Sequence, residues 1–266
     1  MYDYKQQVAD YFNRRTAYDA EGDSHPQEAK RLLDYVPLKS GQTILDLATG
    51  TGLVAIPAAK KVAPSSVIGV DISARMLKQA REKILAEGIN NLELIEADVE
   101  LVEFALEQFD VIFCCSALVY ISDIAAILNK CYDWLKPQGC FAFTTPHKTA
   151  HLAEIKVKVC QDLFNIDLPH IIRPLWTAEK CRNLLQQSGF RNIEIERHQY
   201  SKYKISNNYD SVRIEREFYP RGNPLLDLSK AQKDRLQAEY KKAIEQSIVE
   251  RGVWQVNDNL YVKAFK

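Results

Sequence analysis

Short apolar runs alternate with amphipathic stretches along the first half of the chain. The apolar runs are typical of buried strands and lie at residues 43–48, 66–72, 91–98, 109–117 and 140–145. Amphipathic stretches that predict helices occupy three of the intervals, at residues 52–63, 73–88 and 121–135. Strands that alternate with helices form βαβ units, so the pattern predicts an α/β protein with a parallel sheet covered on both faces.

Further elements flank this alternating region. Residues 1–40 predict two helices, the second of which begins near Ser24 with a proline in its first turn. An insertion at about 206–256 contains a long charged helix, in which Leu236, Tyr240, Ile244 and Ile248 form an apolar stripe at near-helical spacing. A segment of this kind is often part of a pocket or lid. After residue 145 we also expect a helical stretch, a loop at 167–176, a helix at 177–189 and strands at 191–205 and 260–266.

We expect a single domain over residues 1–266, because there is no internal repeat and no linker rich in Gly or Ser. It divides into an N-terminal helical cap (1–40), a core (41–145) and a second half (146–266). The composition, 46% hydrophobic and 26% charged, is that of an ordinary globular protein. No apolar run is long enough for a membrane span, and no secretory signal is visible.

Charge and cysteine content argue against several other classes of protein. Lys and Arg number 35, as do Asp and Glu, and zero net charge argues against a dedicated nucleic-acid binder. The six cysteines form no CxxC pair and lie mostly in apolar or helical segments, which favours reduced thiols in a cytoplasmic protein. The five histidines are scattered without the spacing of metal ligands, so we expect no metal.

The most specific local feature is a glycine-containing turn at residues 46–52, directly after the first core strand. Gly50, Gly52 and Ala55 satisfy the pattern G-x-G-x-x-G/A, and Asp71 follows Gly52 by 19 residues at the end of the next strand. This is the spacing of a dinucleotide fingerprint, so a NAD-dependent oxidoreductase is one interpretation. The chain lacks a Tyr-x-x-x-Lys pair after the fifth strand, which counts against it.

Asp46 distinguishes the dinucleotide interpretation from a second one. A pyrophosphate bound at the following helix N-terminus would meet the Asp46 carboxylate, which is an unfavourable contact. The same charge would attract a sulfonium cofactor that carries an ammonium group. S-adenosylmethionine (SAM) has both groups and no phosphate, so the sequence favours a SAM site.

Two more carboxylates at strand ends suit the adenosine part of SAM. Asp71 can accept hydrogen bonds from both ribose hydroxyls, and Asp98 can accept one from the exocyclic amine of adenine. The backbone N–H of Val99 can meet a ring nitrogen, while Ile72 and Met76 can form apolar walls. Parallel α/β sheets bind ligands at the carboxyl ends of their strands, where these residues are expected.

Five segments, in this order, resemble motifs of the class I SAM-dependent methyltransferases: ILDLATGTG, VIGVDISARML, IEADVE, FDVIFCCSALVYISD and LKPQGCFAF. The resemblance covers about residues 40–145, and the flanks resemble the branch that methylates quinones, malonyl-carrier thioesters and other small metabolites. It implies a Rossmann-like seven-stranded sheet of order 3-2-1-4-5-7-6 with its last strand antiparallel. It also implies SAM as cofactor and S-adenosylhomocysteine (SAH) as product.

The resemblance further implies roles for individual residues. Tyr18, at the end of an N-terminal helix, would cap the cofactor, and the Ser116 carbonyl would accept a hydrogen bond from its ammonium group. Alanine at the first position of the turn replaces the glycine that is common in the family. The methionine moiety would contact Asp46 and the backbone of Ala48, Thr49, Gly50 and Gly52.

Methyl transfer from a sulfonium is an in-line displacement, to which a protein contributes mainly alignment. A general base is needed only if the acceptor keeps its proton. Tyr120 and His147, which follow the fourth and fifth strands, are the catalytic candidates. The substrate-binding candidates, any of which could instead be an ordinary packing or surface residue, are Tyr11, His170, Arg173, Tyr209 and Arg213. We expect the second half of the chain to lie on the acceptor side and its insertion to shape the acceptor pocket.

The leading interpretation is therefore a SAM-dependent methyltransferase acting on an oxygen or nitrogen of a small-molecule metabolite, with carbon left open. The alternatives are the NAD-dependent oxidoreductase and a non-catalytic SAM-binding protein. The segment SALVY after the fourth strand lacks the Asn/Asp-Pro-Pro-Tyr/Phe pattern of nucleic-acid methylation. We expect a small-molecule acceptor, no nucleic-acid partner, and a monomer or homodimer.

Overall fold

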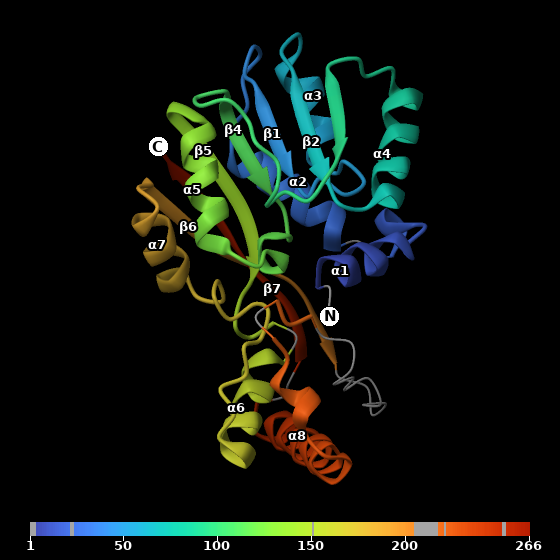
Figure 1. The fold of residues 1–266 in the computed structure, drawn as a ribbon, viewed down its shortest axis with the longest axis vertical. Helices are drawn as coiled ribbons and strands as arrows, with labels where there is room; N and C mark the ends of the chain where they lie inside the picture. Colours follow the sequence, from blue (N-terminus) through green and yellow to red (C-terminus); the bar gives the residue numbers. More distant parts are fainter. Residues whose placement is uncertain (1–3, 22–23, 151, 205–217, 221, 252–253) are drawn as a thin grey trace.

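A computed structural model describes residues 4–21, 24–150, 152–204, 218–220, 222–251 and 254–266. Seven strands form one sheet in the order β3-β2-β1-β4-β5-β7-β6, which confirms the predicted order (Figure 1). The strands are β1 (Ile44–Leu47), β2 (Val67–Asp71), β3 (Leu92–Glu96), β4 (Phe109–Cys114), β5 (Leu135–Pro146), β6 (Arg191–Lys204) and β7 (Trp254–Phe265).

The predicted helices are present in the described residues, and those of the core connect its strands. Ser73 caps α4 by accepting the backbone N–H of Met76, and Gly88 ends that helix in the left-handed conformation, as predicted. Short 3-10 helices are η1 (Tyr18–Ala20), η2 (Leu118–Tyr120) and η4 (Pro224–Asp227). The α-helices are α1 (Tyr4–Asn13), α2 (Ser24–Tyr35), α3 (Ala55–Val62), α4 (Ala74–Glu87), α5 (Ile124–Trp134), α6 (Ala153–Phe164), α7 (Ala178–Gln187) and α8 (Lys230–Arg251).

Strands β1 to β5 are parallel, and β7 runs antiparallel to both β5 and β6. In this register Asp46 of β1 lies opposite Gly69 of β2 and Phe113 of β4. The carboxyl ends of the three central strands therefore meet at one edge of the sheet, where the sequence predicts the ligand site.

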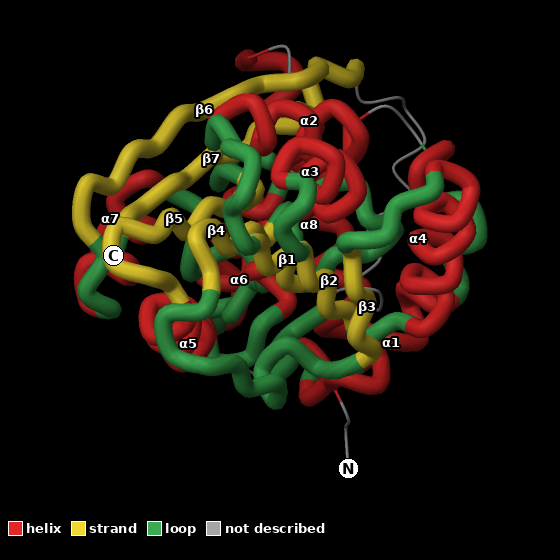
Figure 2. Tube along the Cα trace, turned by 90° about the horizontal axis from the view of Figure 1, so that it is seen from above, coloured by secondary structure: helices red, strands yellow, loops and turns green. Residues whose placement is uncertain are grey.

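Successive side chains of a strand point to opposite faces of the sheet, and here helices cover both faces. Ile44 packs in the cluster formed with α2 and α3, whereas Leu45 and Leu47 pack in the cluster formed with α5 and α7. Figure 2 shows α2 and α3 on one side of the strands and α5 on the other. This is the arrangement predicted from the alternating sequence pattern.

Helices α6 and α8 form a separate helical lobe beyond the end of the sheet (Figure 1). Leu236, Tyr240 and Ile244 of α8 are buried there, which confirms three positions of its predicted apolar stripe; the side chain of Ile248 lies outside the described residues. The lobe's buried cluster consists of Val159, Cys160, Leu168, Tyr219, Leu225, Leu236, Tyr240 and Ile244.

Two strands are longer than the apolar pattern predicts. β7 begins at Trp254 and not at residue 260, so the segment between β6 and β7 is shorter than predicted. The added part of β7 pairs with the end of β6, so backbone hydrogen bonds to a neighbour, and not an apolar run, define it. β5 includes the predicted turn at 136–139, where Gln138 has a positive φ of 65°.

No helix in the described part of the chain is long and apolar enough to cross a membrane. All six cysteines are free thiols, in agreement with the predicted reduced state. Five of them are buried, and the partly exposed one is Cys115.

Candidate active site

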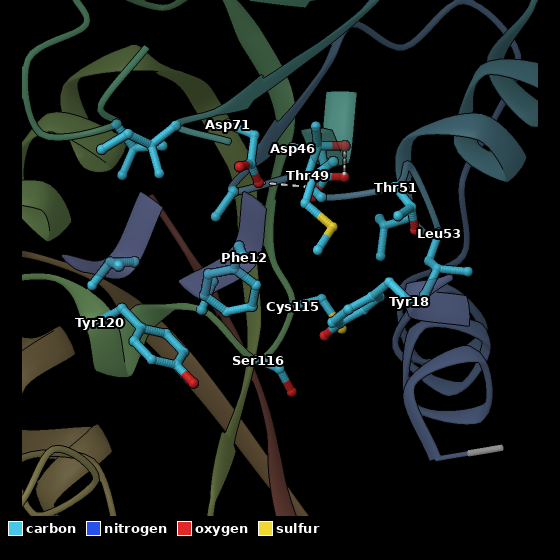
Figure 3. Close-up of a pocket in the computed structure, with 18 of the residues that line it drawn as sticks. Phe12, Tyr18, Asp46, Thr49, Thr51, Leu53, Asp71, Cys115, Ser116 and Tyr120 are labelled. Atoms are coloured by element: carbon cyan, nitrogen blue, oxygen red, sulfur yellow. Dashed lines mark hydrogen bonds between the residues drawn. The ribbon is translucent and has the colours of Figure 1, made fainter. Parts of the chain in front are cut away.

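A pocket lies at the carboxyl ends of β1, β2 and β4, between the strands and the N-terminal helices. Its empty volume, including the open mouth, is about 960 Å³. Figure 3 shows how side chains from several elements point into it. The lining residues are Lys5, Val8, Phe12, Tyr18, His25, Glu28, Ala29, Asp46, Ala48, Thr49, Gly50, Thr51, Leu53, Val54, Asp71, Ile72, Met76, Asp98, Val99, Cys115, Ser116, Ala117, Tyr120 and Ile121.

The glycine-containing turn forms the floor at the end of β1. Ala48, Gly50 and Gly52 have positive φ angles of 52°, 56° and 79°, so the turn has a conformation in which glycine is favoured. A Cβ added at Gly50 would meet nothing within 4 Å, whereas one at Gly52 would lie 2.8 Å from the Ile56 side chain. Gly50 therefore leaves space for a ligand, and Gly52 permits close packing of α3 and does not line the pocket.

Asp46 is the third residue of β1 and is 1% exposed. Its Oδ2 accepts a hydrogen bond from Thr49 Oγ1 at 2.6 Å, while Oδ1 is buried and has no hydrogen-bond partner among the described residues. Burial raises the pKa of Asp46 to about 7, and the Thr49 hydroxyl and the Ala55 backbone N–H oppose this shift. An unpartnered carboxylate oxygen in a pocket wall suits a cationic or hydrogen-bond-donating ligand.

Asp71 is the last residue of β2 and lies next to Asp46 at one end of the pocket (Figure 3). Its Oδ2 accepts the backbone N–H of Gly50 and its Oδ1 that of Ser73, each at 2.8 Å. Burial raises the pKa of Asp71 to about 6. Each carboxylate oxygen can accept a second hydrogen bond, so this side chain can still accept from two ligand hydroxyls.

Asp98 follows β3, beside the apolar wall that Val99 and Met76 contribute. Its Oδ1 accepts the backbone N–H of Glu100 at 3.0 Å and Lys5 Nζ at 3.3 Å, and Lys5 also pairs with Glu100. Lys5 of α1, which the sequence did not predict here, therefore binds one oxygen of the carboxylate that is expected to bind the adenine amine.

Ser116 follows β4 and has a positive φ of 55°, a strained conformation of the kind concentrated at functional sites. Its backbone N–H donates to Thr144 Oγ1 at 2.8 Å, and its hydroxyl donates to Glu28 Oε1 at 2.5 Å. Glu28, on α2, is 4% exposed, and burial raises its pKa. In Figure 3 Ser116 lies at the opposite end of the pocket from Asp46 and Asp71.

An aromatic wall faces this second end of the pocket. The rings of Phe12 and Tyr120 meet edge to face at 5.5 Å, and Phe218 contacts Tyr120 in the same way at 5.5 Å. Phe218 belongs to the insertion between β6 and β7, so this segment reaches the pocket wall. Burial raises the pKa of Tyr120 to about 12, so its phenol keeps its proton at neutral pH and is a poor general base.

Tyr18 of η1 is held at the pocket by neighbouring side chains. The Arg15 guanidinium lies 4.3 Å from the centre of its ring, and the His25 ring stacks on it at 4.7 Å. The next residue, Asp19, accepts hydrogen bonds from Thr51 at 2.5 Å and from Lys83 at 2.8 Å. These contacts fix the N-terminal segment to the glycine-containing turn and to α4.

The structure brings most of the predicted cofactor residues together, and their roles remain predictions. Gly52 is set back from the pocket, and Tyr11 packs its ring against Phe12 and Phe218 without lining it. The predicted residues that do line the pocket are Tyr18, Asp46, Ala48, Thr49, Gly50, Asp71, Ile72, Met76, Asp98, Val99, Ser116 and Tyr120.

His147 follows β5 as predicted but does not line the pocket. Its Nδ1 lies 2.8 Å from Thr149 Oγ1, which donates to Asp258 Oδ2 at 2.5 Å, and Arg197 Nε donates to Asp258 Oδ1 at 2.9 Å. Burial and the charge of Arg197 lower the pKa of His147. The histidine thus belongs to a polar cluster that joins β5, β6 and β7, and its position does not support a catalytic role.

The remaining substrate candidates are not brought to the pocket. His170 is buried in the 167–176 loop, and Arg173 donates to the Leu168 carbonyl at 3.1 Å and pairs with Asp167, so both contacts stabilise that loop. Tyr209 and Arg213 lie outside the described residues.

Glu28 is the pocket residue that sequence reasoning most clearly missed. It precedes Leu32 by one helical turn and so lies on the buried face of α2, beside Ala29 and Leu33. A carboxylate on the apolar face of an amphipathic helix was the available signal. The sequence did not indicate a site role for Lys5 or His25, because a polar residue near the start of a helix is ordinarily exposed.

Comparison of this chain with known proteins identifies the family to which it is similar. The methyltransferase domain family matches residues 44–139, from β1 into β5. The ubiquinone/menaquinone biosynthesis C-methyltransferase UbiE of Klebsiella pneumoniae is 37% identical over 181 residues, covering 61% of this chain and 71% of that protein. Aklanonic acid methyltransferase DauC of a Streptomyces species is 30% identical over 146 residues, covering 54% of this chain and 66% of that protein.

Among solved structures, phosphoethanolamine N-methyltransferase 2 of Haemonchus contortus, in complex with phosphomonomethylethanolamine and SAH, superposes with a TM-score of 0.55 at 23% identity. The superposition covers 90% of this chain but only 52% of that one, and it shows the shared fold alone. The chain thus spans just under two thirds of DauC and about half of the Haemonchus protein. From the fold and its 37% identity to UbiE, this chain belongs to the class I SAM-dependent methyltransferases.

Proposed function

We propose that this chain transfers the methyl group of SAM to a nitrogen, oxygen or carbon atom of a small-molecule metabolite. Family membership supports the reaction class, and the described relatives act in quinone and aklanonic acid methylation, as their names state. The observation that carries the cofactor assignment is Asp46, which lines the pocket and whose buried Oδ1 has no hydrogen-bond partner among the described residues. A cofactor with a sulfonium and an ammonium group would supply the missing positive charge.

The chain's own residues fit the parts of this cofactor. Asp71 would accept the ribose hydroxyls, and Asp98 and Val99 would bind the adenine edge beside Ile72 and Met76. Asp46, Ala48, Thr49 and Gly50 would surround the methionine end, with the Ser116 carbonyl accepting from the ammonium group and Tyr18 as a cap. Bound SAM supplies a methyl group on a positively charged sulfur, which leaves readily in an in-line displacement.

Alignment and exclusion of water are the contributions that the protein side chains can make. Phe12, Tyr18 and Tyr120 form a largely apolar wall, which would hold the acceptor near the methyl group and keep water out. We propose a positioning role for Tyr120, in place of a proton-accepting one, because its raised pKa disfavours the phenolate. The absence of a nucleic-acid partner, a cytoplasmic location and a monomeric or homodimeric state belong to the same proposal.

Calorimetric titration with SAM, SAH and NAD tests the cofactor assignment directly. We expect saturable binding of SAM and SAH and none of NAD, and binding of NAD alone would favour the oxidoreductase instead. Incubation with SAM labelled in its methyl group, together with a metabolite extract, then tests catalysis. Binding of SAM without any labelled small-molecule product would support the non-catalytic alternative.

A further inference from the structure

Glu28 is a buried carboxylate in the pocket that the proposed cofactor contacts do not use. Ser116 Oγ donates to Glu28 Oε1 at 2.5 Å, and the side chains of Thr144 and Asn259 are near enough to lower the pKa of Glu28. Ser116 follows β4, Thr144 belongs to β5 and Asn259 to β7, so the Glu28 carboxylate lies beside these neighbouring strands, and Glu28 and Ser116 line the pocket. The side chain itself is 4% exposed.

No Lys or Arg among the described residues forms a salt bridge with Glu28 or shifts its pKa. Burial raises the pKa of Glu28, and the Ser116, Thr144 and Asn259 side chains lower it. Lys5, the lysine of the pocket wall, pairs with Asp98 and Glu100. Burial of a charged carboxylate without a cation beside it is costly, and a cationic ligand group beside it reduces that cost.

The surroundings of Glu28 limit what that ligand can be. The negative charges of Glu28 and Asp46 both help to raise the pKa of the Cys115 thiol, so Cys115 lies near both carboxylates. Phe12, Tyr18 and Tyr120 line the same pocket and offer ring faces and apolar area. An acceptor with a positive nitrogen and an apolar or aromatic skeleton would fit both features.

We propose that Glu28 binds the protonated amino group of the methyl acceptor, so that the acceptor is an amine on an apolar or aromatic skeleton and its nitrogen is methylated. This inference rests on the proposed function, because it requires SAM in the same pocket.

The chemistry balances with Glu28 as the proton acceptor. The bound ammonium gives one proton to the Glu28 carboxylate, which leaves a nitrogen with a free electron pair. That pair forms the N–C bond to the methyl group while the S–C bond breaks and its electrons stay on sulfur. The methylated product carries the positive charge away as an ammonium, and Glu28 releases its proton to water. Burial raises the pKa of Glu28, which makes its carboxylate a better proton acceptor.

The test measures binding of matched amines and alcohols to the SAH-loaded protein by calorimetry. The probe pairs are benzylamine and benzyl alcohol, 2-phenylethylamine and 2-phenylethanol, and tryptamine and tryptophol. We expect at least one amine to bind about tenfold or more tightly than its alcohol, the scale of a charge-assisted hydrogen bond. Equal affinity within all three pairs would overturn the inference.

Glu28→Gln tests whether that preference depends on this carboxylate, and its fold is checked by circular dichroism. We expect the amine preference to disappear in Glu28→Gln and to fall severalfold in Glu28→Asp, which keeps the charge but withdraws it. Asp34→Asn removes an exposed carboxylate from the same helix, where Asp34 pairs with Lys30, and should keep the wild-type preference.

The failure of this inference differs from a failure of the proposed function. An amine preference that survives in Glu28→Gln would overturn the inference, as would a tenfold loss of SAH affinity in that variant, which would assign Glu28 to the cofactor. Wild-type protein that binds neither SAM nor SAH would instead contradict the proposed function itself.

Discussion

Asp46 and Asp71 are carboxylates whose environment disfavours their charged forms. Burial raises the pKa of Asp46 to about 7 and that of Asp71 to about 6, from an ordinary value of 3.8. Their contribution to folding stability is therefore fully present below pH 3.8 and is lost as pH rises through about 6 and 7. A cationic ligand acts in the opposite direction, because it favours the ionised carboxylates.

We expect the affinity for SAM to fall when pH is lowered through about 7, because Asp46 must lose its proton to attract the cofactor. The fall approaches about tenfold per pH unit below the pKa of Asp46, and Asp71 steepens it below about pH 6. Calorimetry between about pH 5.5 and 8 measures this dependence. Asp46→Asn should bind SAM weakly and lack the step near pH 7. A wild-type affinity that is constant over this range would contradict the raised pKa.

Replacement of Asp71 by alanine should affect both ligand binding and stability. Loss of the ribose contacts should weaken SAM binding by about 1.5–3 kcal/mol, and the unpartnered N–H groups of Gly50 and Ser73 should lower the free energy of unfolding by about 1–3 kcal/mol. Calorimetry and urea unfolding measure the two effects. As a control, Asp123→Ala removes the N-cap of α5, and it should cost about 1 kcal/mol of stability without changing SAM affinity.

At the scale of elements, the site residues that the sequence predicts correctly are those whose position follows from a local pattern, such as the end of a strand. Asp46 and Asp71 end apolar runs, and parallel strands bring their ends together whatever the rest of the fold does. Glu28 and His147 depend instead on contacts between distant segments. Glu28 accepts a hydrogen bond from Ser116 after β4, and the His147 ring lies beside Asp258 of the last strand. No local pattern carries such a pairing, so the sequence predicted His147 in the site and left Glu28 out.

Helix α1 is attached to the core through the start of α4. Asn13 Oδ1 accepts the Ser73 hydroxyl at 2.8 Å and the Arg75 backbone N–H at 3.1 Å, so one side chain joins the end of α1 to the cap of α4. Because α1 carries Lys5, Val8 and Phe12 of the pocket wall, this attachment bears on ligand binding.

We expect Asn13→Ala to weaken SAM binding by about 1 kcal/mol, the scale of one or two neutral hydrogen bonds. The free energy of unfolding should change by a similar amount or less, because α1 packs at the periphery. Gln7→Ala, at an exposed position of the same helix, is the control and should leave both quantities unchanged. Equal SAM affinity in wild type and Asn13→Ala would show that the pocket does not depend on this attachment.

At the scale of the whole molecule, the pocket and the α6–α8 lobe are built around different buried clusters. The strands at the pocket pack with α2, α3, α5 and α7, whereas the lobe has its own core between α6, η4 and α8. The insertion links the two parts, since Phe218 contacts Tyr120 at the pocket and the neighbouring Tyr219 is buried in the lobe. The predicted role of this insertion at the acceptor is compatible with that position and remains a proposal.

Leu236→Ala tests whether the lobe contributes to folding independently of cofactor binding. Leu236 is 1% exposed in the lobe cluster, so its truncation should lower the free energy of unfolding by about 2–5 kcal/mol through lost burial and a cavity. Leu226→Ala, at a side chain that is 60% exposed, is the matched control and should change stability by less than about 0.5 kcal/mol.

SAM affinity, measured by calorimetry at a temperature where both variants are folded, should stay within about twofold of wild type, because no residue of the lobe cluster lines the pocket. A tenfold loss of SAM affinity in Leu236→Ala alone would mean that the lobe supports the cofactor pocket through the insertion, and the two parts would then have to be treated as one cooperative unit.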